Sequence, residues 1–309
     1  MLKKKSLIIT NCTSRKRKSV PSMCKIGGFE SANVSDLADK WITTLVETNE
    51  RSLAETLYCG RVFTEVKCAV ALLDAKLFIT SAGLGLIDST QKVPPYSSTI
   101  SKGSSDYVLD KLTEGNVSDW WDALNRKSPF SVAFTTYPYE LILIAMSLPY
   151  FRLIEQQLIE LNASEKSKLR LFLRVNKNDI SSCLLPYLMP YDERFDSQNG
   201  PNRGTLNDFP QRALRHFVES ILTNTSNHSC ENHSVLVEDV LKELQPYKII
   251  AGAKCTDDEI SDLILKYRSK CLSSPSKMLR FFRDSLGIAC EQKRFQRLFH
   301  NVTVLKETI

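Results

Sequence analysis

A glycine turn followed by a proline loop is the part of the chain whose residues are best suited to binding and chemistry. Ser81, Gly83 and Gly85 are small enough for the backbone to come close to a ligand. Two prolines then hold the chain extended before Tyr96, whose aromatic ring could stack on a base. These four residues are expected to line a pocket, with an ordinary strand-to-loop connection as the alternative.

A second polar stretch follows the apolar run Leu7–Thr10. Asn11 and Cys12 come first, and a basic cluster with Arg15 and Lys16 follows. Small polar residues and cations directly after a buried strand can bind phosphate through backbone N–H groups and fixed charge. Cys12 is expected in the base or sugar pocket, but it has no histidine nearby in the sequence, so we expect it to be a small buried residue rather than a nucleophile. A solvated surface loop is the alternative for this stretch.

A third polar stretch spans residues 191–212 and combines acids and arginines with turn-forming glycine and proline. Loops of this composition often hold functional residues on a rigid scaffold, although polar surface loops are also common.

The elements that must position these stretches are those of an α/β protein. Leu7–Thr10 is expected to be the first, central strand of a parallel sheet, and Leu77–Ile79 the second. In such a sheet, ligands bind at the carboxyl ends of the strands, where the first two stretches begin. The remaining pattern predicts helices over 34–59, 63–73, 139–148 and 211–222, and strands over 131–134, 169–175 and 184–189.

A separate helical domain is expected at the C-terminal end. Residues 1–223 form the predicted α/β domain, and residues 235–309 the predicted helical domain, with helices over 235–244, 257–271, 276–286 and 290–302. The polar segment between them contains His228, Cys230 and His233, but a structural zinc site needs four ligands, so we expect a linker and no metal. A helix, a turn at Gly287 and a basic helix outline a helix-turn-helix. Its outward cations are Lys293, Arg294 and Arg297.

The charge distribution favours a polyanionic partner. The chain has 309 residues and a net charge of +6, yet residues 1–25 contain eight Lys or Arg and no acid. No apolar face accompanies this charge and no apolar run is long enough for a membrane helix, so nucleic acid is favoured over membrane. Nine scattered cysteines suit a reducing cytoplasm. No Walker or dinucleotide motif is present, so no ATP, NAD or other cofactor is expected.

Four blocks of the first hundred residues resemble a known group of proteins. The blocks are Asn11–Lys16, Leu57–Phe63, Ile79–Ile87 and Pro94–Thr99. They resemble a group of uncharacterised bacterial and phage-related domains. That group is related to the uracil-glycosylase-like domain of archaeosine synthases and, more distantly, to peroxide-stress proteins of the YaaA type.

The resemblance implies a uracil-glycosylase-like parallel sheet flanked by helices, with chemistry or binding at a nucleobase. Some similar proteins are anti-phage DNA glycosylases that excise modified bases such as glucosylated hydroxymethylcytosine. The resemblance therefore implies that phage double-stranded DNA with modified bases is the partner. The Gly-Gln-Asp-Pro and His-Pro-Ser motifs of ordinary uracil glycosylases are missing here, which argues against uracil as the substrate.

Hydrolysis of an N-glycosidic bond passes through a cationic sugar, so it needs a carboxylate and donors for the departing base. Asp192 and Asp196 are the first candidates for the carboxylate, followed by Asp88. Asn11 could read the base edge, and Tyr96 could stack on a base that has left the helix. The expected phosphate ligands in the α/β domain are Arg15, Lys16, Arg61, Arg194 and Arg203.

The sequence thus predicts a monofunctional DNA glycosylase, because no lysine stands out as a Schiff-base nucleophile. Two alternatives stay open: a DNA-binding protein of the same fold without catalysis, and an enzyme that exchanges or modifies a base in tRNA.

Overall fold

The computed structural model describes residues 5–125, 139–197, 204–225, 228–244, 252–267 and 274–304. The chain divides into two compact units, Met1–Tyr247 and Lys248–Ile309. The predicted strand over 131–134 and the candidate phosphate ligand Arg203 lie outside the described residues.

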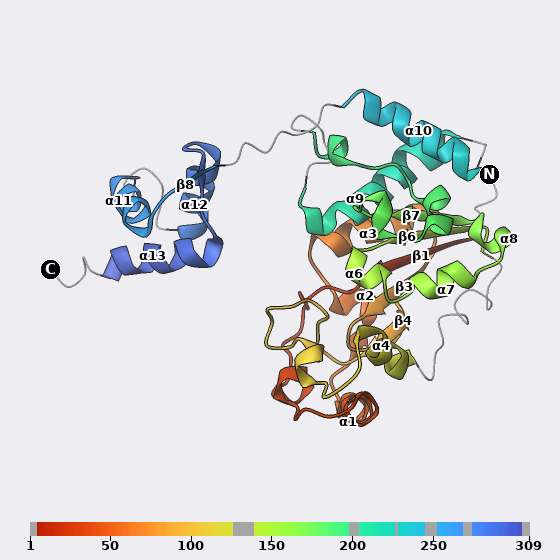
Figure 1. The fold of residues 1–309 in the computed structure, drawn as a ribbon, viewed down its shortest axis with the longest axis horizontal. Helices are drawn as coiled ribbons and strands as arrows, with labels where there is room; N and C mark the ends of the chain where they lie inside the picture. The colour runs from red at the N-terminus through yellow and green to blue at the C-terminus, as the bar shows by residue number, and fades with distance from the viewer. Residues whose placement is uncertain are drawn as a thin grey trace. The chain divides into compact units, whose positions relative to one another are not determined.

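A five-stranded, mostly parallel sheet forms the centre of the first unit (Figure 1). Its strands are β1 (Ser6–Asn11), β3 (Lys76–Ser81), β4 (Gly85–Asp88), β6 (Leu141–Ala145) and β7 (Leu169–Phe172). Their order is β4-β3-β1-β6-β7, and β4 alone runs antiparallel to its neighbour. The expectation of an α/β fold with a central first strand is confirmed.

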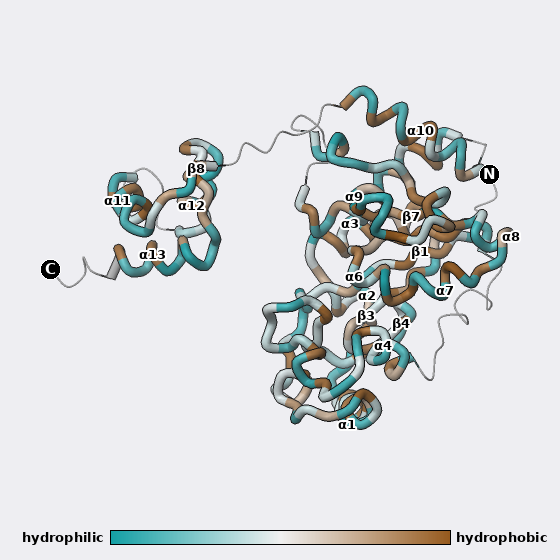
Figure 2. Tube along the Cα trace, in the orientation of Figure 1, coloured by the Kyte–Doolittle hydropathy of each residue, from teal (hydrophilic) through white to brown (hydrophobic). Residues whose placement is uncertain are grey.

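The sequence of β1 explains its central place. Leu7, Ile8 and Ile9 are fully buried, as a strand covered on both faces requires. Ile8 is in register with Leu77 of β3 on one side and with Leu143 of β6 on the other. Figure 2 shows the same hydrophobic character along the sheet.

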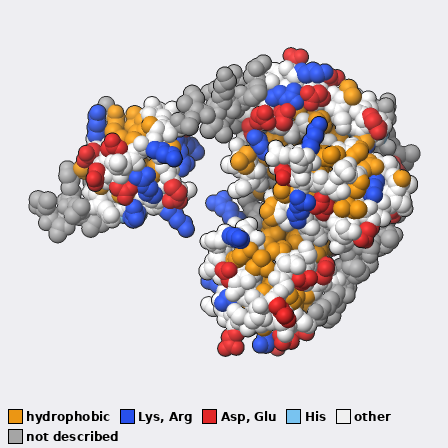
Figure 3. Space-filling model, in the orientation of Figure 1, with side chains coloured by type: hydrophobic (Ala, Val, Ile, Leu, Met, Phe, Trp, Pro, Cys, Tyr) orange, Lys and Arg blue, Asp and Glu red, His pale blue; other side chains and the backbone are white. Residues whose placement is uncertain are grey.

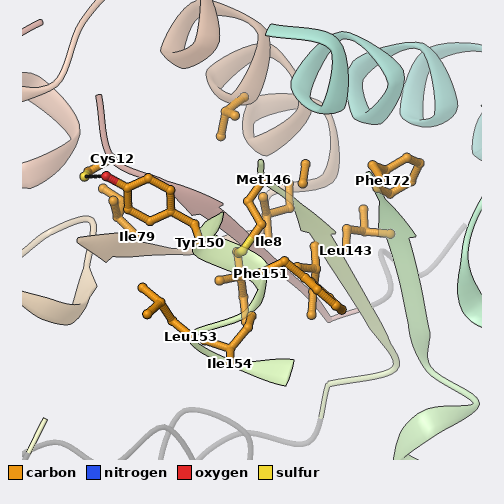
Figure 4. Close-up of a cluster of buried hydrophobic side chains, with 14 of the residues drawn as sticks. Ile8, Cys12, Ile79, Leu143, Met146, Tyr150, Phe151, Leu153, Ile154 and Phe172 are labelled. Atoms are coloured by element: carbon orange, nitrogen blue, oxygen red, sulfur yellow. Dashed lines mark hydrogen bonds between the residues drawn. The ribbon is translucent and has the colours of Figure 1, made fainter. Parts of the chain in front are cut away.

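Helices cover both faces of this sheet. Helices α3 (Arg61–Leu73) and α9 (Phe209–His216) pack against each other, α3 against β1, and α9 against β6 and β7. Helix α6 (Leu148–Phe151) lies on the opposite face (Figures 1 and 4). Among the residues that the structure describes, the further α-helices of the unit are α1 (Val34–Glu47), α2 (Ala54–Leu57), α4 (Val117–Asn125), α7 (Glu155–Glu160), α8 (Ala163–Lys166) and α10 (Cys230–Lys242). A short ribbon joins β2 (Ser52–Leu53) to β5 (Lys92–Val93).

Three predicted elements differ from the structure. Residues 139–148 were expected to form a helix, but they contain β6, because an apolar run without periodicity fits a buried strand equally well. Residues 184–189 were expected to form a strand, but a 3₁₀ helix with Pro186 inside it spans Ser182–Tyr187. The helix expected over 34–59 ends at Glu47.

The second unit contains α11 (Asp257–Tyr267), α12 (Pro275–Asp284) and α13 (Gln292–Val304) around its own apolar core. Strands β8 (Ala253–Lys254) and β9 (Ile288–Ala289) pair with each other, so the unit is not entirely helical, contrary to the prediction from the sequence. Helix α10 was assigned to this domain from the sequence. The structure places it in the first unit, because Val237 and Leu241 are buried in the core of that unit. No helix in the described ranges is long and apolar enough to cross a membrane.

Candidate functional site

A cluster of buried hydroxyl groups lies where β3 ends. The Tyr96 hydroxyl is hydrogen-bonded to Ser81 Oγ and lies 2.7 Å from the Tyr58 hydroxyl. Tyr96 has no exposed surface, and Tyr58 has almost none. Burial is the main reason that the pKa values of both hydroxyls are raised, so both are neutral donors and acceptors at pH 7.

The glycine turn is fixed against this cluster. A Cβ at Gly83 would lie 2.6 Å from Cε2 of Tyr96, so only glycine fits beside the ring. Two tryptophans hold the turn: Trp41 Nε1 donates to the Gly83 carbonyl and Trp120 Nε1 to the Ala82 carbonyl, each at 2.7 Å. Packing against Tyr96 therefore requires glycine at position 83, whether or not a ligand also comes close to the backbone there.

Gly85 has a left-handed backbone with φ of 72°, which glycine adopts without strain. A Cβ there would lie 2.6 Å from Asn125 Oδ1, which accepts a hydrogen bond from the Leu86 amide. On its open side, the turn borders a cavity of about 500 Å³ that is also lined by α1, β5 and α4.

Amide groups gather at the carboxyl ends of β1 and β6. Asn11 Oδ1 accepts hydrogen bonds from the Ser147 amide at 3.1 Å and from Gln211 Nε2 at 3.3 Å. Gln211 Nε2 also donates to Thr10 Oγ1 and to the Ala145 carbonyl. The other end of this amide, Gln211 Oε1, is buried and has no hydrogen-bond partner within the described residues. A fully buried acceptor without a partner among the described residues therefore lies at this edge of the sheet.

Cys12 lies beside the same edge. Its thiol is 3.3 Å from the Tyr150 hydroxyl of α6, which points toward it (Figure 4). Both groups are buried, as expected for Cys12 from the sequence, and burial raises the pKa of Tyr150.

Lys16 points onto the tyrosine cluster. Its Nζ lies 4.3 Å from the centroid of the Tyr96 ring and 5.7 Å from that of Tyr58, and it donates to the Thr13 carbonyl at 3.4 Å. Burial lowers the pKa of this amine. The Tyr96 ring is thus covered by Lys16 and has no exposed face on which a base could stack. Arg15 is exposed, as a phosphate ligand would be.

Asp88 does not belong to this site. Strand β4 runs antiparallel to β3, so its last residue, Asp88, pairs with Phe78 near the start of β3. There it forms an ion pair with Lys76. Burial raises the pKa of Asp88, but hydrogen bonds from Lys76 and Thr90 outweigh burial and lower it. The expectation that Asp88 is a catalytic candidate is therefore corrected.

Asp192 and Arg194 bind each other. Asp192 begins a 3₁₀ helix (Glu193–Asp196) and accepts from the Arg194 amide, and Arg194 also forms ion pairs with Asp192 at 2.7 Å and with Glu238 of α10 at 2.9 Å. The hydrogen bonds that Arg194 donates to Asp192 and Glu238 raise its pKa further above its usual range. Arg194 therefore links α10 to the 3₁₀ helix Glu193–Asp196, and its charge is paired with carboxylates rather than presented to DNA.

Asp196 joins the third stretch to α9. It forms ion pairs with Arg174 at 3.0 Å and with Arg212 at 2.8 Å. The Arg212 side chain, only 2% exposed, also binds Asp208 at 2.7 Å. Because Arg212 follows Gln211 in the chain, Asp196 is tied to the helix that carries the unpartnered amide oxygen.

Arg61 stands at the start of α3 and lies 3.2 Å from Glu65 and 3.7 Å from Asp208. With Arg212, Arg215 and two glutamates it lines a cavity of about 440 Å³. Its guanidinium is therefore shared with carboxylates, which reduces its value as a phosphate ligand.

In the second unit, the expected DNA-contacting cations differ in their surroundings. Arg294 and Arg297 both pair with Asp257, at 2.6 and 2.9 Å, and both Lys293 and Arg297 are exposed. Figure 3 shows Lys and Arg intermixed with Asp and Glu on the visible face of this unit.

The His228–His233 segment is structural. His233 Nδ1 accepts a 2.8 Å hydrogen bond from buried Arg170, and the Cys230 thiol donates to the Pro186 carbonyl. No group of ligands that could hold a metal occurs among the described residues.

Sequence reasoning missed Gln211 and Tyr150, and it did not give Tyr58 a role at the site. Tyr58 stood within one of the four blocks, which was a usable signal. Gln211 was placed only as the first residue of a helix, and Tyr150 only near a predicted helix, so neither showed which way its side chain would point.

The chain matched no protein-family model, no curated protein and no solved structure.

Proposed function

We propose that the chain is a DNA glycosylase that hydrolyses the N-glycosidic bond of a modified base and leaves an abasic site, in defence against phage. One observation carries the proposal: residues from all four sequence blocks meet at one edge of the sheet. The first block supplies Asn11 and Lys16, the second Tyr58, the third Ser81 and the fourth Tyr96. Lys16 packs on the Tyr96 ring, and hydrogen bonds join Tyr58, Ser81 and Tyr96.

The groups at this edge suit a nucleobase. Asn11 and Gln211 bring two amides together, and the buried Gln211 Oε1 can accept a hydrogen bond from an exocyclic amine such as that of cytosine. Exposed Arg15 and Arg17 lie in the loop that follows β1, where they can contact phosphates.

Asp196 is the preferred carboxylate for the cationic sugar, because its partner Arg212 belongs to the same helix as Gln211. Asp192 is less suited, because Arg194 ties it to α10.

A second function is favoured by a specific observation. Each of the three candidate carboxylates is held in an ion pair, Asp88 by Lys76, Asp192 by Arg194, and Asp196 by Arg174 and Arg212. A protein that binds DNA without hydrolysing it would show the same arrangement.

Incubation with plain, hydroxymethylated and glucosylated phage DNA, followed by alkali and a gel, separates the two. Breaks confined to one modified DNA support the glycosylase. Binding with steep salt dependence and no breaks on any DNA supports the binding protein instead. Activity on folded RNA only would support the tRNA alternative.

A further inference from the structure

The helices of the second unit differ in the sign of their charge. Helix α11 carries one lysine, Lys266, and four acids, Asp257, Asp258, Glu259 and Asp262. Helix α12 instead carries one acid, Asp284, and three cations, Lys277, Arg280 and Arg283. A clustering of cations on one element is the electrostatic footprint of a surface that binds a polyanion.

Helix α13 is the DNA-contacting helix predicted from the sequence, but much of its charge is used inside the unit. Arg294 and Arg297 share one carboxylate of α11, that of Asp257. The backbone amides of Lys293 and Arg294 donate to the carboxylate of Glu291, so the start of α13 already faces a negative charge. This helix is therefore poorly suited to receive phosphate groups.

Helix α12 presents cations that no carboxylate neutralises. It buries one face in the core of the unit, through Met278, Leu279 and Phe282. Lys277, Arg280 and Arg283 are exposed, and among the described residues none of the three forms an ion pair, not even with the neighbouring Asp284. Their charge is therefore available to a partner.

A hollow lies beside these cations. A cavity of about 260 Å³ is lined by Ser276, Leu279, Arg280, Arg283, Asp284 and Gln292. Arg283 donates to the Cys290 carbonyl at 2.7 Å, which holds this side chain in place without neutralising its charge. Two guanidinium groups, a hydroxyl and an amide thus supply donors around the hollow, and groups of these types are those that contact phosphate oxygens.

The length of the basic face also suits a nucleic-acid strand. Lys277 and Arg283 are six positions apart in one helix, which corresponds to about 9 Å along its axis. Phosphates of one DNA strand follow one another at about 3.4 Å along the duplex axis. The face can therefore contact two or three successive phosphates.

We propose that the exposed face of α12, formed by Lys277, Arg280 and Arg283, binds the phosphate backbone of duplex DNA, while Arg294 and Arg297 hold α13 to α11. For its partner the inference rests on the proposed function, since the glycosylase and the alternative DNA-binding protein both need DNA. It moves the contact from the helix that the sequence favoured to the one before it.

The salt dependence of DNA binding by the full chain tests the proposal. Each phosphate contact that is lost lowers the slope of log affinity against log salt concentration by about 0.9. Lys277→Gln and Arg280→Gln should each lower the slope by this amount, equally on two duplexes of unrelated sequence, because phosphate contacts carry no sequence information. Lys266→Gln removes the same charge from an exposed position on α11 and should keep the wild-type slope.

Unchanged slopes in both α12 variants, or a wild-type chain that binds no duplex, overturn the proposal. A lower slope in Arg297→Gln with none in Arg280→Gln assigns the contact to α13 and overturns it as well. An equal fall in Lys266→Gln does the same, because it shows an effect of net charge alone. Thermal unfolding of each variant shows whether it is folded.

A parallel assay of free base keeps the two proposals distinct. Base release by a chain whose slope is unchanged in the α12 variants refutes the α12 surface alone. Slopes that depend on Lys277 and Arg280, without base release from any DNA, refute the glycosylase alone.

Discussion

The hydroxyl groups of Tyr58 and Tyr96 lie 2.7 Å apart, although 38 positions separate the two residues in the chain. Ser81 binds the Tyr96 hydroxyl as well, so one buried oxygen joins the second, third and fourth sequence blocks. This relationship ties the glycine turn at the end of β3 to the loop before α3. It gives the site a rigid wall onto which Lys16 packs.

Removing the shared hydroxyl should destabilise the first unit. In Tyr96→Phe the ring remains, but Tyr58 and Ser81 each lose a buried partner, which costs about 1–3 kcal/mol. The free energy of unfolding in urea measures the loss. Tyr187→Phe, at a half-buried tyrosine of the 3₁₀ helix Ser182–Tyr187, is the matched control. Equal stability of Tyr96→Phe and the wild type would contradict the assigned hydrogen bonds.

A methyl group at Gly83 should be poorly tolerated. Its Cβ would lie 2.6 Å from Cε2 of Tyr96, and overpacking of this kind costs about 1–3 kcal/mol. Gly28→Ala is the control, since the nearest atom to a Cβ there is 4.0 Å away. The two unfolding free energies should therefore differ clearly. A Gly83→Ala chain as stable as Gly28→Ala would show that the turn is not packed on Tyr96.

Removing Arg212 should strongly destabilise the first unit. Arg212→Met leaves two carboxylates, Asp196 and Asp208, without this buried counter-ion, and breaking a buried pair in this way costs about 3–5 kcal/mol. Lys18→Met removes only an exposed pair with Glu50 and should have no measurable effect on stability. Urea unfolding of both variants provides the comparison, and similar small losses would contradict the buried network.

Alkaline pH should unfold the chain through its buried tyrosines. Burial raises the pKa values of Tyr58, Tyr96 and Tyr150 in the folded chain, whereas in the unfolded chain tyrosines ionise near pH ~10. Above that pH the folded chain holds more protons than the unfolded chain. Stability is therefore fully present below pH ~10 and falls as the pH rises further.

Absorbance of tyrosinate and circular dichroism, followed together during the titration, check this expectation. The last part of the tyrosinate signal should appear only as the circular dichroism is lost. A complete tyrosinate signal from a chain that is still folded would show that the cluster is open to solvent.

The sequence was a good guide to the central sheet and a poor guide to the partners of individual side chains. Strands β1 and β3 were predicted because short apolar runs end abruptly in polar residues. The sequence of β6 fits a helix as well as a strand, because a strand buried on both faces has no period-2 alternation to mark it.

The candidate site was predicted only in outline, because side-chain direction depends on contacts distant in sequence. Asp88 is the last residue of β4, and the antiparallel direction of this strand places it opposite Phe78, near the start of β3 and away from the site. Tyr96 was expected to present its ring to a base, but Lys16, 80 positions earlier, covers it. Arg194 likewise forms an ion pair with Glu238, and Asp196 with Arg212. Both partners are distant in sequence, so the pattern around residues 192–196 did not predict them.

Direct measurement of free base, by mass spectrometry, tests the central claim that the edge formed by Asn11 and Gln211 excises a modified base. The wild-type chain should release glucosylated hydroxymethylcytosine from glucosylated phage DNA and nothing from plain DNA. Gln211→Leu should release it at least tenfold more slowly. The exposed Gln156→Leu should match the wild type. No free base from any DNA, or equal rates for wild type and a folded Gln211→Leu chain, would contradict the account.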